Sequence, residues 1–205
     1  MLNATSAVPQ PMRPHGIQGR IFGALMERLN RPAYRLAAGL ISLPPGGAFL
    51  EIGFGTGRLM EMLAERDGTV FLAGVDASPL MVATATRRLD RRHMTRDLRE
   101  GNAERLAWGE DEFDAAAALH CFQFWSDPVS VLNEVHRTLK PGGHFVMVLR
   151  RHEGRETEWL PNPWSRMGDE TGSAATLMEK AGFDVEYGIE RGNDNGHSPV
   201  LIGRC

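Results

Sequence analysis

A glycine-rich connection limits the possible folds of this chain more than any other part of its sequence. Residues 48–52 form a short, nearly continuous apolar run, and Gly53, Gly55 and Gly57 follow it before the helical pattern of residues 58–66. Such a run is typical of a strand that is buried on both faces. Glycines after a strand let a ligand approach the backbone, and N–H groups at a helix start can meet polar ligand atoms. The sequence therefore predicts a strand, a binding loop and a helix, in that order.

Strands and helices continue to alternate through the middle of the chain. Apolar runs predict further strands at residues 70–75, 113–119 and 144–149, and we expect a polar strand near 95–101. Helical spacing of apolar residues predicts helices at 79–92 and from Pro128 to the stop at Lys140-Pro141-Gly142-Gly143. This alternation is typical of a parallel sheet with helices on both faces.

The last part of the chain departs from this alternation. We expect a helix at 174–181, ended by Gly182, and strands at 183–190 and 199–204. The turn-rich residues 192–196 leave no room for a helix between these two strands. They should therefore pair antiparallel, which makes the sheet mixed.

Two helices are expected before the first strand. Apolar residues in 17–30 recur at spacings near three and four, which predicts the apolar face of an amphipathic helix: Ile17, Ile21, Leu25, Met26 and Leu29. Pro32 is well placed to start a second helix that reaches Ile41. Met26 and Tyr34 on these helices face either a substrate or the core.

The pattern indicates one domain after a lead-in segment. Residues 1–16 are rich in proline and small polar residues and are expected to be flexible. The domain covers 17–205, with cap helices at 17–44, a cofactor-binding core at 48–150, and a substrate-side loop and terminal strands at 151–205. We expect the irregular residues 150–171 and the cap helices to shape the acceptor pocket.

Composition excludes several classes of protein. Apolar residues make up 42% and charged residues 24% of the chain, so it can bury a core, and the net charge of −3 lacks the positive field of a nucleic-acid binder. The arginines between 87 and 99 alternate with acidic residues, as on a solvated helix face. Cys121 and Cys205 are too few for a disulfide scaffold or a zinc site, so no metal is expected. No membrane span or secretory signal is present, and we expect a cytoplasmic protein.

Two further residues, Asp76 and Arg58, narrow the class of ligand that the glycine-rich connection could bind. Asp76 ends the second expected strand, where a carboxylate can accept both hydroxyls of a ribose. The alternative is an exposed acid that only favours the dipole of the following helix. Arg58 stands where a dinucleotide fingerprint needs its third glycine, and no Gly-Lys-Ser/Thr follows for a phosphate loop.

Four ordered motifs together carry a family resemblance. They are residues 49–59, the sequence Val75-Asp76-Ala77-Ser78, residues 101–106, and Leu139-Lys140-Pro141-Gly142-Gly143. They resemble the class I S-adenosylmethionine-dependent methyltransferases, most of all the branch that holds ubiquinone/menaquinone-biosynthesis-like and other small-molecule methyltransferases. The resemblance covers about 49–149. It implies an α/β, Rossmann-like, doubly wound seven-stranded mixed sheet with a reversed final strand, and S-adenosyl-L-methionine as cofactor with S-adenosyl-L-homocysteine as product.

The same resemblance implies which residues bind the cofactor. Glu51 and Gly53 would border its methionine portion, and Asp76 would hold the ribose. Asn102 stands where many relatives have aspartate, and its amide oxygen can still accept a hydrogen bond from adenine. The full implied set is Glu51, Gly53, Phe54, Gly55, Gly57, Asp76, Ala77, Ser78, Asn102, Ala103, Leu119, His120 and Trp125.

His120 is the candidate catalytic residue. It ends the fourth expected strand, and a histidine there can act as a base because it titrates near neutral pH. The alternative is packing around the cofactor or a structural hydrogen bond. Phe122, Phe124 and Trp125 follow it and suit either an apolar substrate, a cation–π contact with the sulfonium, or the core.

The expected function is transfer of a methyl group to a small organic acceptor by in-line displacement. The Asn/Asp-Pro-Pro-Tyr/Phe signature of enzymes that methylate adenine or glutamine amino groups is absent after the fourth expected strand, and nucleic acid is not expected as a partner. Two alternatives stay open: an inactive cofactor-binding sensor or scaffold, and a nucleotide-dependent oxidoreductase, against which Arg58 argues.

Overall fold

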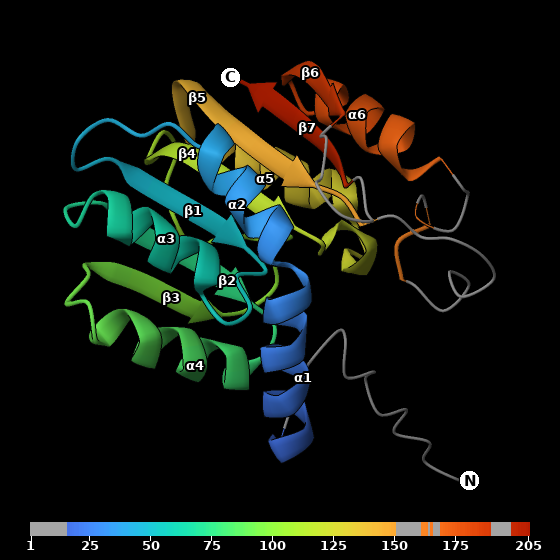
Figure 1. The fold of residues 1–205 in the computed structure, drawn as a ribbon. Helices are drawn as coiled ribbons and strands as arrows, with labels where there is room; N and C mark the ends of the chain where they lie inside the picture. The colour runs from blue at the N-terminus through green and yellow to red at the C-terminus, as the bar shows by residue number, and fades with distance from the viewer. Residues whose placement is uncertain (1–15, 151–160, 164, 166–168, 190–197) are drawn as a thin grey trace, which may run out of the picture.

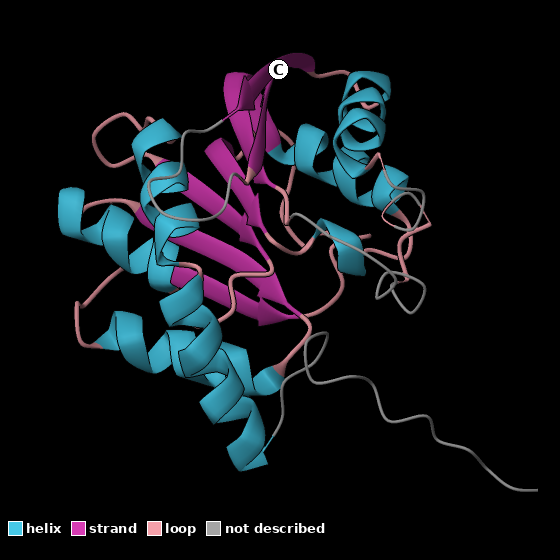
Figure 2. Ribbon diagram, turned by 45° about the vertical axis from the view of Figure 1, so that its right-hand side comes forward, coloured by secondary structure: helices cyan, strands magenta, loops and turns pink. Residues whose placement is uncertain are grey.

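The computed structural model describes residues 16–150, 161–163, 165, 169–189 and 198–205. Nearly all of the lead-in segment expected to be flexible, most of the substrate-side loop and the turn-rich residues 192–196 lie outside this part of the chain. The described residues form a three-layer α/β structure in which a central sheet carries helices on both faces (Figures 1 and 2).

The described residues form a seven-stranded sheet of the expected mixed kind. Its strands are β1 (Ala48–Ile52), β2 (Phe71–Asp76), β3 (Arg96–Glu100), β4 (Phe113–Leu119), β5 (Leu139–Val148), β6 (Asp184–Ile189) and β7 (Pro199–Arg204). Their order is β3-β2-β1-β4-β5-β7-β6. The first five pair in parallel, and β7 runs antiparallel to both neighbours, so the predicted reversal of the last strand is confirmed.

Each face of the sheet has its own apolar core. The helices are α1 (Gly16–Leu29), α2 (Arg31–Leu40), α3 (Arg58–Arg66), α4 (Pro79–Asp90), α5 (Pro128–Thr138) and α6 (Glu170–Lys180). Residues of α2, α3 and α4 pack on the face that holds Phe49 and Leu72, and residues of α5 and α6 pack on the face that holds Leu50 and Phe145. Because side chains alternate along a strand, Glu51 shares the face of Phe49.

Two elements begin four or five residues earlier than the sequence predicts, and the other boundaries differ by at most two residues. Strand β5 begins at Leu139 rather than at 144, because the Gly142 N–H donates to the Cys205 carbonyl and the Cys205 N–H donates to the Gly143 carbonyl. Helix α6 begins at Glu170 rather than at 174, because the Asp169 carboxylate accepts a hydrogen bond from the Gly172 N–H and caps the helix.

The apolar stripe predicted on the first helix is not turned toward the core. Helix α1 forms as expected, but Ile21, Leu25 and Leu29 are 66%, 51% and 59% exposed. Its buried face is made by glycine instead: a Cβ on Gly23 would lie 3.2 Å from the Met81 methyl group of α4. Because Gly23 has no side chain, α1 can approach α4 closely, and this contact decides which face of α1 is buried.

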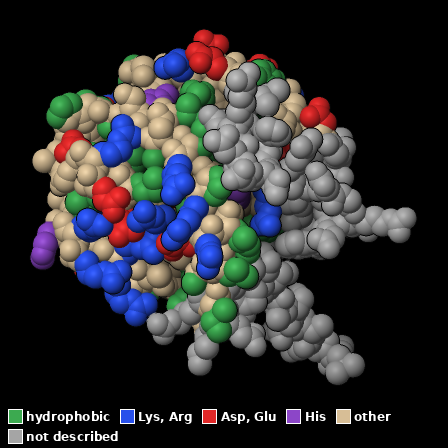
Figure 3. All heavy atoms as spheres, viewed as in Figure 1, with side chains coloured by type: hydrophobic (Ala, Val, Ile, Leu, Met, Phe, Trp, Pro, Cys, Tyr) green, Lys and Arg blue, Asp and Glu red, His purple; other side chains and the backbone are tan. Residues whose placement is uncertain are grey.

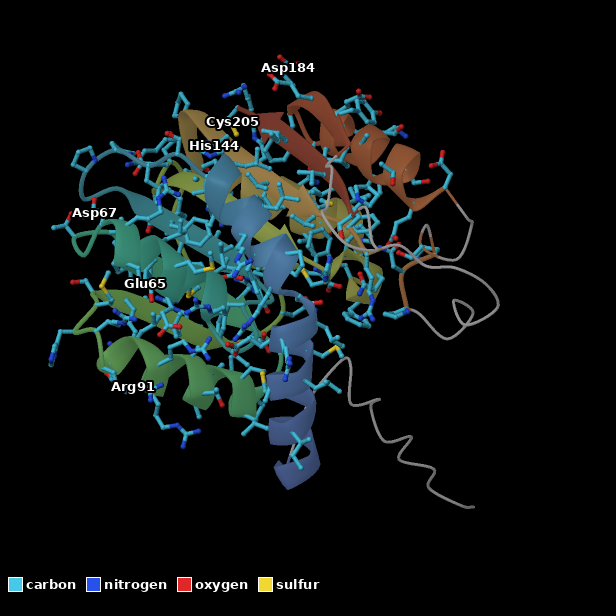
Figure 4. The ribbon with its side chains drawn as sticks, viewed as in Figure 1. Glu65, Asp67, Arg91, His144, Asp184 and Cys205 are labelled. Atoms are coloured by element: carbon cyan, nitrogen blue, oxygen red, sulfur yellow. The ribbon has the colours of Figure 1, made fainter. Side chains whose placement is uncertain are left out.

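The two cysteines lie at opposite ends of the sheet. Cys205 follows β7 at the amino end of β5, beside His144 (Figure 4), whereas Cys121 follows the carboxyl end of β4. Both thiols are free. No helix in the described ranges is long and apolar enough to cross a membrane.

Candidate functional site

A cavity of about 490 Å³ lies at the carboxyl ends of the central strands. Residues that end β1, β2, β3 and β4 line it: Ile52, Asp76, Glu100 and Leu119. Helix α1 closes another side with Gly23, Met26 and Glu27. In a doubly wound sheet, ligands bind outside the carboxyl ends of the strands near the point where the strand order reverses, which here lies between β1 and β4.

Nine of the thirteen residues that the sequence singled out line this cavity. They are Gly53, Gly55, Asp76, Ala77, Asn102, Ala103, Leu119, His120 and Trp125. The other four lie behind the wall: Phe54 and Glu51 are each 1% exposed, Ser78 is fully buried at the start of α4, and Gly57 packs against α4. Residues at the carboxyl ends of four strands, β1 to β4, therefore meet in one place.

The three glycines after β1 have different tasks. All three have positive φ, at 68° for Gly53, 53° for Gly55 and 74° for Gly57. A Cβ on Gly55 would meet nothing within 4 Å, so this glycine leaves space at the cavity. A Cβ on Gly57 would lie 2.8 Å from the Ala85 Cβ, so this glycine lets the loop pack against α4. The structure thus shows a packing role for Gly57, while its place beside the cofactor stays a prediction.

Asp76 holds the glycine loop and the start of α4 together. Its Oδ2 accepts a hydrogen bond of 2.8 Å from the Gly55 N–H, and its Oδ1 accepts one of 2.9 Å from the Ser78 N–H. Burial raises the pKa of the Asp76 carboxyl, and these two hydrogen bonds act in the opposite direction. The carboxylate retains further lone pairs that can accept hydrogen bonds from a ligand.

Glu51 is an acid buried under the cavity. It is 1% exposed, and its Oε2 has no hydrogen-bond partner in the described part of the chain. Burial raises its pKa well above the usual value, and the charge of Asp76 raises it further. A cation placed near this carboxyl would supply the missing partner.

Helix α1 brings Glu27 to the cavity, a residue that the sequence reasoning missed. Glu27 Oε2 accepts a hydrogen bond of 2.7 Å from the Thr56 hydroxyl and forms an ion pair of 2.8 Å with Arg88 of α4. Burial alone would raise the pKa of Glu27, but the bonds from Thr56 and Arg88 lower it below the usual value. The spacing of Gly23, Glu27 and Asn30 was the signal available, since these residues share one helix face.

The cap helices also supply the two residues that the sequence left undecided. Met26 and Tyr34 both line the cavity. Burial raises the pKa of Tyr34, and the nearby charge of Glu51 contributes to the shift. The structure thus places Met26 at the cavity, whereas Tyr34 both lines the cavity and packs against the core on the face of Phe49.

The end of β4 carries a strained backbone. His120 has φ of 51°, a region that costs free energy for a residue with a side chain. The turn is held by a hydrogen bond of 2.9 Å from the His120 N–H to the Val148 carbonyl, and by one of 2.7 Å from the Gln123 side chain to the His120 carbonyl. This conformation places His120 on the cavity wall, with the Ser198 hydroxyl 3.5 Å from its Nε2.

The aromatic cluster after β4 divides between core and cavity. Phe122 is 1% exposed and belongs to the core, where its ring meets Trp125 edge to face at 5.4 Å. Phe124 and Trp125 line the cavity. Cys121 lines it too, donating a hydrogen bond of 3.3 Å from its thiol to the Ile52 carbonyl, and burial raises the pKa of this thiol.

The wall of the cavity is more acidic than basic. Of its described lining residues, Glu27, Asp76 and Glu100 are acids and Arg150 is the one arginine. The buried carboxyl of Glu51 lies close enough to Asp76 for their charges to interact. A cavity wall with this excess of acidic residues favours a ligand that carries positive charge.

Comparisons with known proteins agree with this geometry. The model of the family described as "Methyltransferase domain" matches residues 50–147. An uncharacterized methyltransferase of Synechocystis, sll0829, is 30% identical over 159 residues, which is 71% of this chain and 70% of the relative. A ubiquinone biosynthesis O-methyltransferase of Cereibacter sphaeroides is 31% identical over 155 residues, 68% of this chain and 61% of the relative. The crystal structure of a SAM-dependent methyltransferase from Aquifex aeolicus superposes with a TM-score of 0.70 at 17% identity, covering 89% of this chain and 97% of that one.

Proposed function

The chain belongs to the S-adenosylmethionine-dependent methyltransferases, and from that premise we propose that it methylates a small organic acceptor in the cavity at the carboxyl ends of β1 to β4. One observation carries the proposal. Asp76, Asn102 and His120, which lie at the ends of three different strands, line a single cavity beside the glycine loop.

The residues present fit the cofactor of this family. The open space at Gly55 admits ligand atoms close to the backbone, and the buried Glu51 Oε2 lacks a hydrogen-bond partner within the described structure. S-adenosylmethionine carries an ammonium group and a sulfonium, and the acidic wall complements both. We assign Glu51 to the methionine ammonium, where a cation would stabilise the charged carboxylate.

The nucleoside part has its own candidates along the neighbouring strand ends. Asp76 would accept hydrogen bonds from the ribose hydroxyls, because two of its lone pairs are used by Gly55 and Ser78 and the others remain. Ala77 continues the wall after β2, and Asn102 with Ala103 continues it after β3, where adenine would lie. Phe54, Gly57 and Ser78 would act through packing and helix capping, since they lie behind the wall.

S-adenosylmethionine would supply a methyl group activated by its sulfonium: a bond from the acceptor atom to the methyl carbon would form in line as the carbon–sulfur bond breaks and S-adenosylhomocysteine leaves. The protein's task is then to align the acceptor and exclude water. We place the acceptor at the ends of β4 and β5, because most of the residues assigned to the cofactor lie at the ends of β1, β2 and β3, whereas the end of β4 would border both ligands. His120, Phe124, Trp125 and Arg150 line that side.

His120 is our candidate for the group that receives a proton from the acceptor. Its strained backbone sets it on the cavity wall at the end of β4, and strain of this kind is retained where function requires it. An acceptor hydroxyl or acidic carbon loses a proton during methylation, and a positioned imidazole can take it.

The proposal is tested by calorimetric titration with S-adenosylmethionine, S-adenosylhomocysteine and NADH, followed by transfer of a labelled methyl group to small molecules from a cell extract. We expect saturable binding of both sulfur compounds, no binding of NADH, and label in a low-mass product. Binding of NADH alone would overturn the assignment of the cavity. Binding of the sulfur compounds together with label found only in macromolecules would overturn the proposal that the acceptor is a small molecule.

A further inference from the structure

Helix α1 presents an apolar stripe to solvent. Ile21, Leu25 and Leu29 are four residues apart and therefore lie along one side of the helix, and each is more than half exposed. Figure 3 shows hydrophobic side chains gathered over α1 with arginine side chains beside them. Single exposed apolar residues are ordinary, but an aligned set on one helix indicates a binding surface.

The charge around this stripe is positive although the whole chain is acidic. Residues 16–40 contain four arginines and one glutamate, whereas the complete chain has a net charge of −3. The glutamate, Glu27, is turned inward and paired with Arg88. Arg28, Arg31 and Arg35 are exposed. The outward side of α1 and the start of α2 thus expose apolar side chains and arginines on one surface.

The stripe lies next to the cavity. The opposite side of α1 lines the cavity with Gly23, Met26 and Glu27, so a body that touches the stripe is separated from the cavity by this one helix. The pairing of Glu27 with Arg88 and Thr56 fixes α1 on α4 and on the glycine loop. The stripe therefore has a fixed orientation with respect to the site.

We propose that the exposed side of α1, with Arg28, Arg31 and Arg35, is a docking surface for an anionic lipid bilayer. Three aligned apolar side chains can enter the headgroup region of a membrane while the arginines contact anionic lipids. A second protein copy fits less well, because a stable protein interface buries roughly 800 Å² on each partner, whereas the large exposed apolar side chains described on α1 are three, Ile21, Leu25 and Leu29. The proposal concerns where the protein acts and goes beyond the proposed methyl transfer.

The test is sedimentation of the protein with sucrose-loaded vesicles. One set contains phosphatidylcholine alone, and the other contains equal parts of phosphatidylcholine and phosphatidylglycerol. We expect clear binding to the second set, weak binding to the first, and weakening by salt, since salt screens exposed charges. No binding of the unmodified protein to anionic vesicles at low salt would overturn the proposal.

Two sets of variants separate the apolar and the electrostatic contributions. Ile21→Ser/Leu25→Ser/Leu29→Ser should lower the partition coefficient at least about tenfold, because the buried apolar area is lost. Each of Arg28→Gln, Arg31→Gln and Arg35→Gln should lower it about fivefold, from about 1 kcal/mol per cation near an anionic surface. All these side chains are exposed, so the variants should keep the unfolding temperature of the parent.

Matched controls use exposed residues away from α1. Val129→Ser/Tyr187→Ser removes exposed apolar groups from α5 and β6, and Arg91→Gln/Lys180→Gln removes exposed cations from the ends of α4 and α6. Figure 4 shows Arg91 pointing away from α4. Losses in the controls equal to those in the α1 variants would overturn the assignment to this surface. Conversion of a dimer to a monomer by the serine variants, without a change in vesicle binding, would assign the stripe to a second copy instead.

Discussion

The Gly55 N–H donates a hydrogen bond of 2.8 Å to Asp76 Oδ2, and this bond joins the glycine loop after β1 to the end of β2. The second oxygen of the same carboxylate is held at 2.9 Å by the Ser78 N–H. The side chain that would bind the ribose is therefore oriented by the backbone before any ligand enters. Preorganisation of this kind reduces the entropy lost on binding.

Replacement of Asp76 by asparagine should weaken S-adenosylmethionine binding by about 1–3 kcal/mol, because charge-assisted hydrogen bonds would become neutral ones. Isothermal calorimetry measures the loss directly. Asp90→Asn, at the exposed end of α4, is the control and should leave the affinity unchanged. Unaltered affinity in a folded Asp76→Asn protein would remove this residue from the site.

Glu51→Gln should stabilise the ligand-free protein increasingly as the pH rises. The folded protein holds the pKa of Glu51 above its unfolded value, through burial first and the charge of Asp76 second. The stability that this group contributes is therefore complete below its unfolded pKa of about 4.5 and is lost as the pH rises through the folded pKa. Thermal unfolding across pH 4–9 measures the difference between the two proteins. A difference that does not change with pH would contradict the prediction.

The same Glu51→Gln protein should bind S-adenosylmethionine more weakly than the parent. A neutral amide cannot form an ion pair with the methionine ammonium. Greater stability at high pH combined with weaker cofactor binding would distinguish a buried functional acid from one that serves packing alone.

Alanine at Gly55 and at Gly57 should have separable effects. Gly57→Ala should cost about 2–4 kcal/mol of unfolding free energy, because it combines a positive φ with a Cβ placed 2.8 Å from the Ala85 Cβ. Gly55→Ala should cost about 1 kcal/mol of unfolding free energy, because the alanine would adopt a positive φ but its Cβ would contact no neighbouring atom. Its Cβ would instead occupy the cavity and lower cofactor affinity.

Denaturant unfolding and calorimetry on both glycine variants check this pair. The double variant Gly57→Ala/Ala85→Gly is a rescue control, and it should be less destabilised than the sum of its two single changes. Equal loss of stability in the Gly55 and Gly57 variants would show that the contact with Ala85 has no role.

The ion pair between Glu27 and Arg88 should contribute about 1–2 kcal/mol, measured by a double-mutant cycle with Glu27→Gln and Arg88→Gln. The side chains are only 21% and 16% exposed, so solvent screens the pair weakly. The pair of Arg92 with Glu65 on the surface is 46% and 38% exposed, and a cycle there should give less than about 1 kcal/mol. Coupling energies of the same size in both cycles would contradict the assignment.

His120→Asn should lower turnover by about 10²–10⁴ while cofactor affinity stays nearly the same, if His120 takes the proton. Asparagine tolerates the positive φ at this position better than other residues do, which limits the loss of stability. Steady-state kinetics with labelled cofactor and an acceptor found in the extract screen gives the turnover. Full activity of the variant would leave His120 with a packing role.

The order of strands and helices along the chain could be predicted because the pattern of apolar residues and the capping residues of each element lie within its own short stretch of sequence. The run before Gly53 and the pair Asp127-Pro128 place their elements within a residue or two of the observed ones. The start of α6 was placed four residues late because one capping residue, Asp169, outweighs the polar composition that follows it.

The site was predicted where its residues follow strands and was missed where a helix supplies them. Asp76, Asn102 and His120 could be expected at the cavity because each lies at the carboxyl end of a strand, and the carboxyl ends of parallel strands meet at one side of the sheet. Glu27 reaches the cavity only because Gly23 lets α1 pack on Met81. Periodicity predicted the apolar stripe of α1 but not which side of the helix packs on α4, and Ile21, Leu25 and Leu29 of that stripe are exposed.

The insertion of β7 between β5 and β6 has a consequence for how the protein matures during synthesis. Strand β5 leaves the ribosome on the order of seconds before β7, its partner, because translation adds roughly 5–20 residues each second. Until then one side of β5 offers unpaired backbone groups, which are a template for aggregation. The nascent chain therefore passes through a vulnerable interval that ends when Pro199–Arg204 is delivered, and substitutions that weaken β7 should lower the yield of native protein more than its final stability.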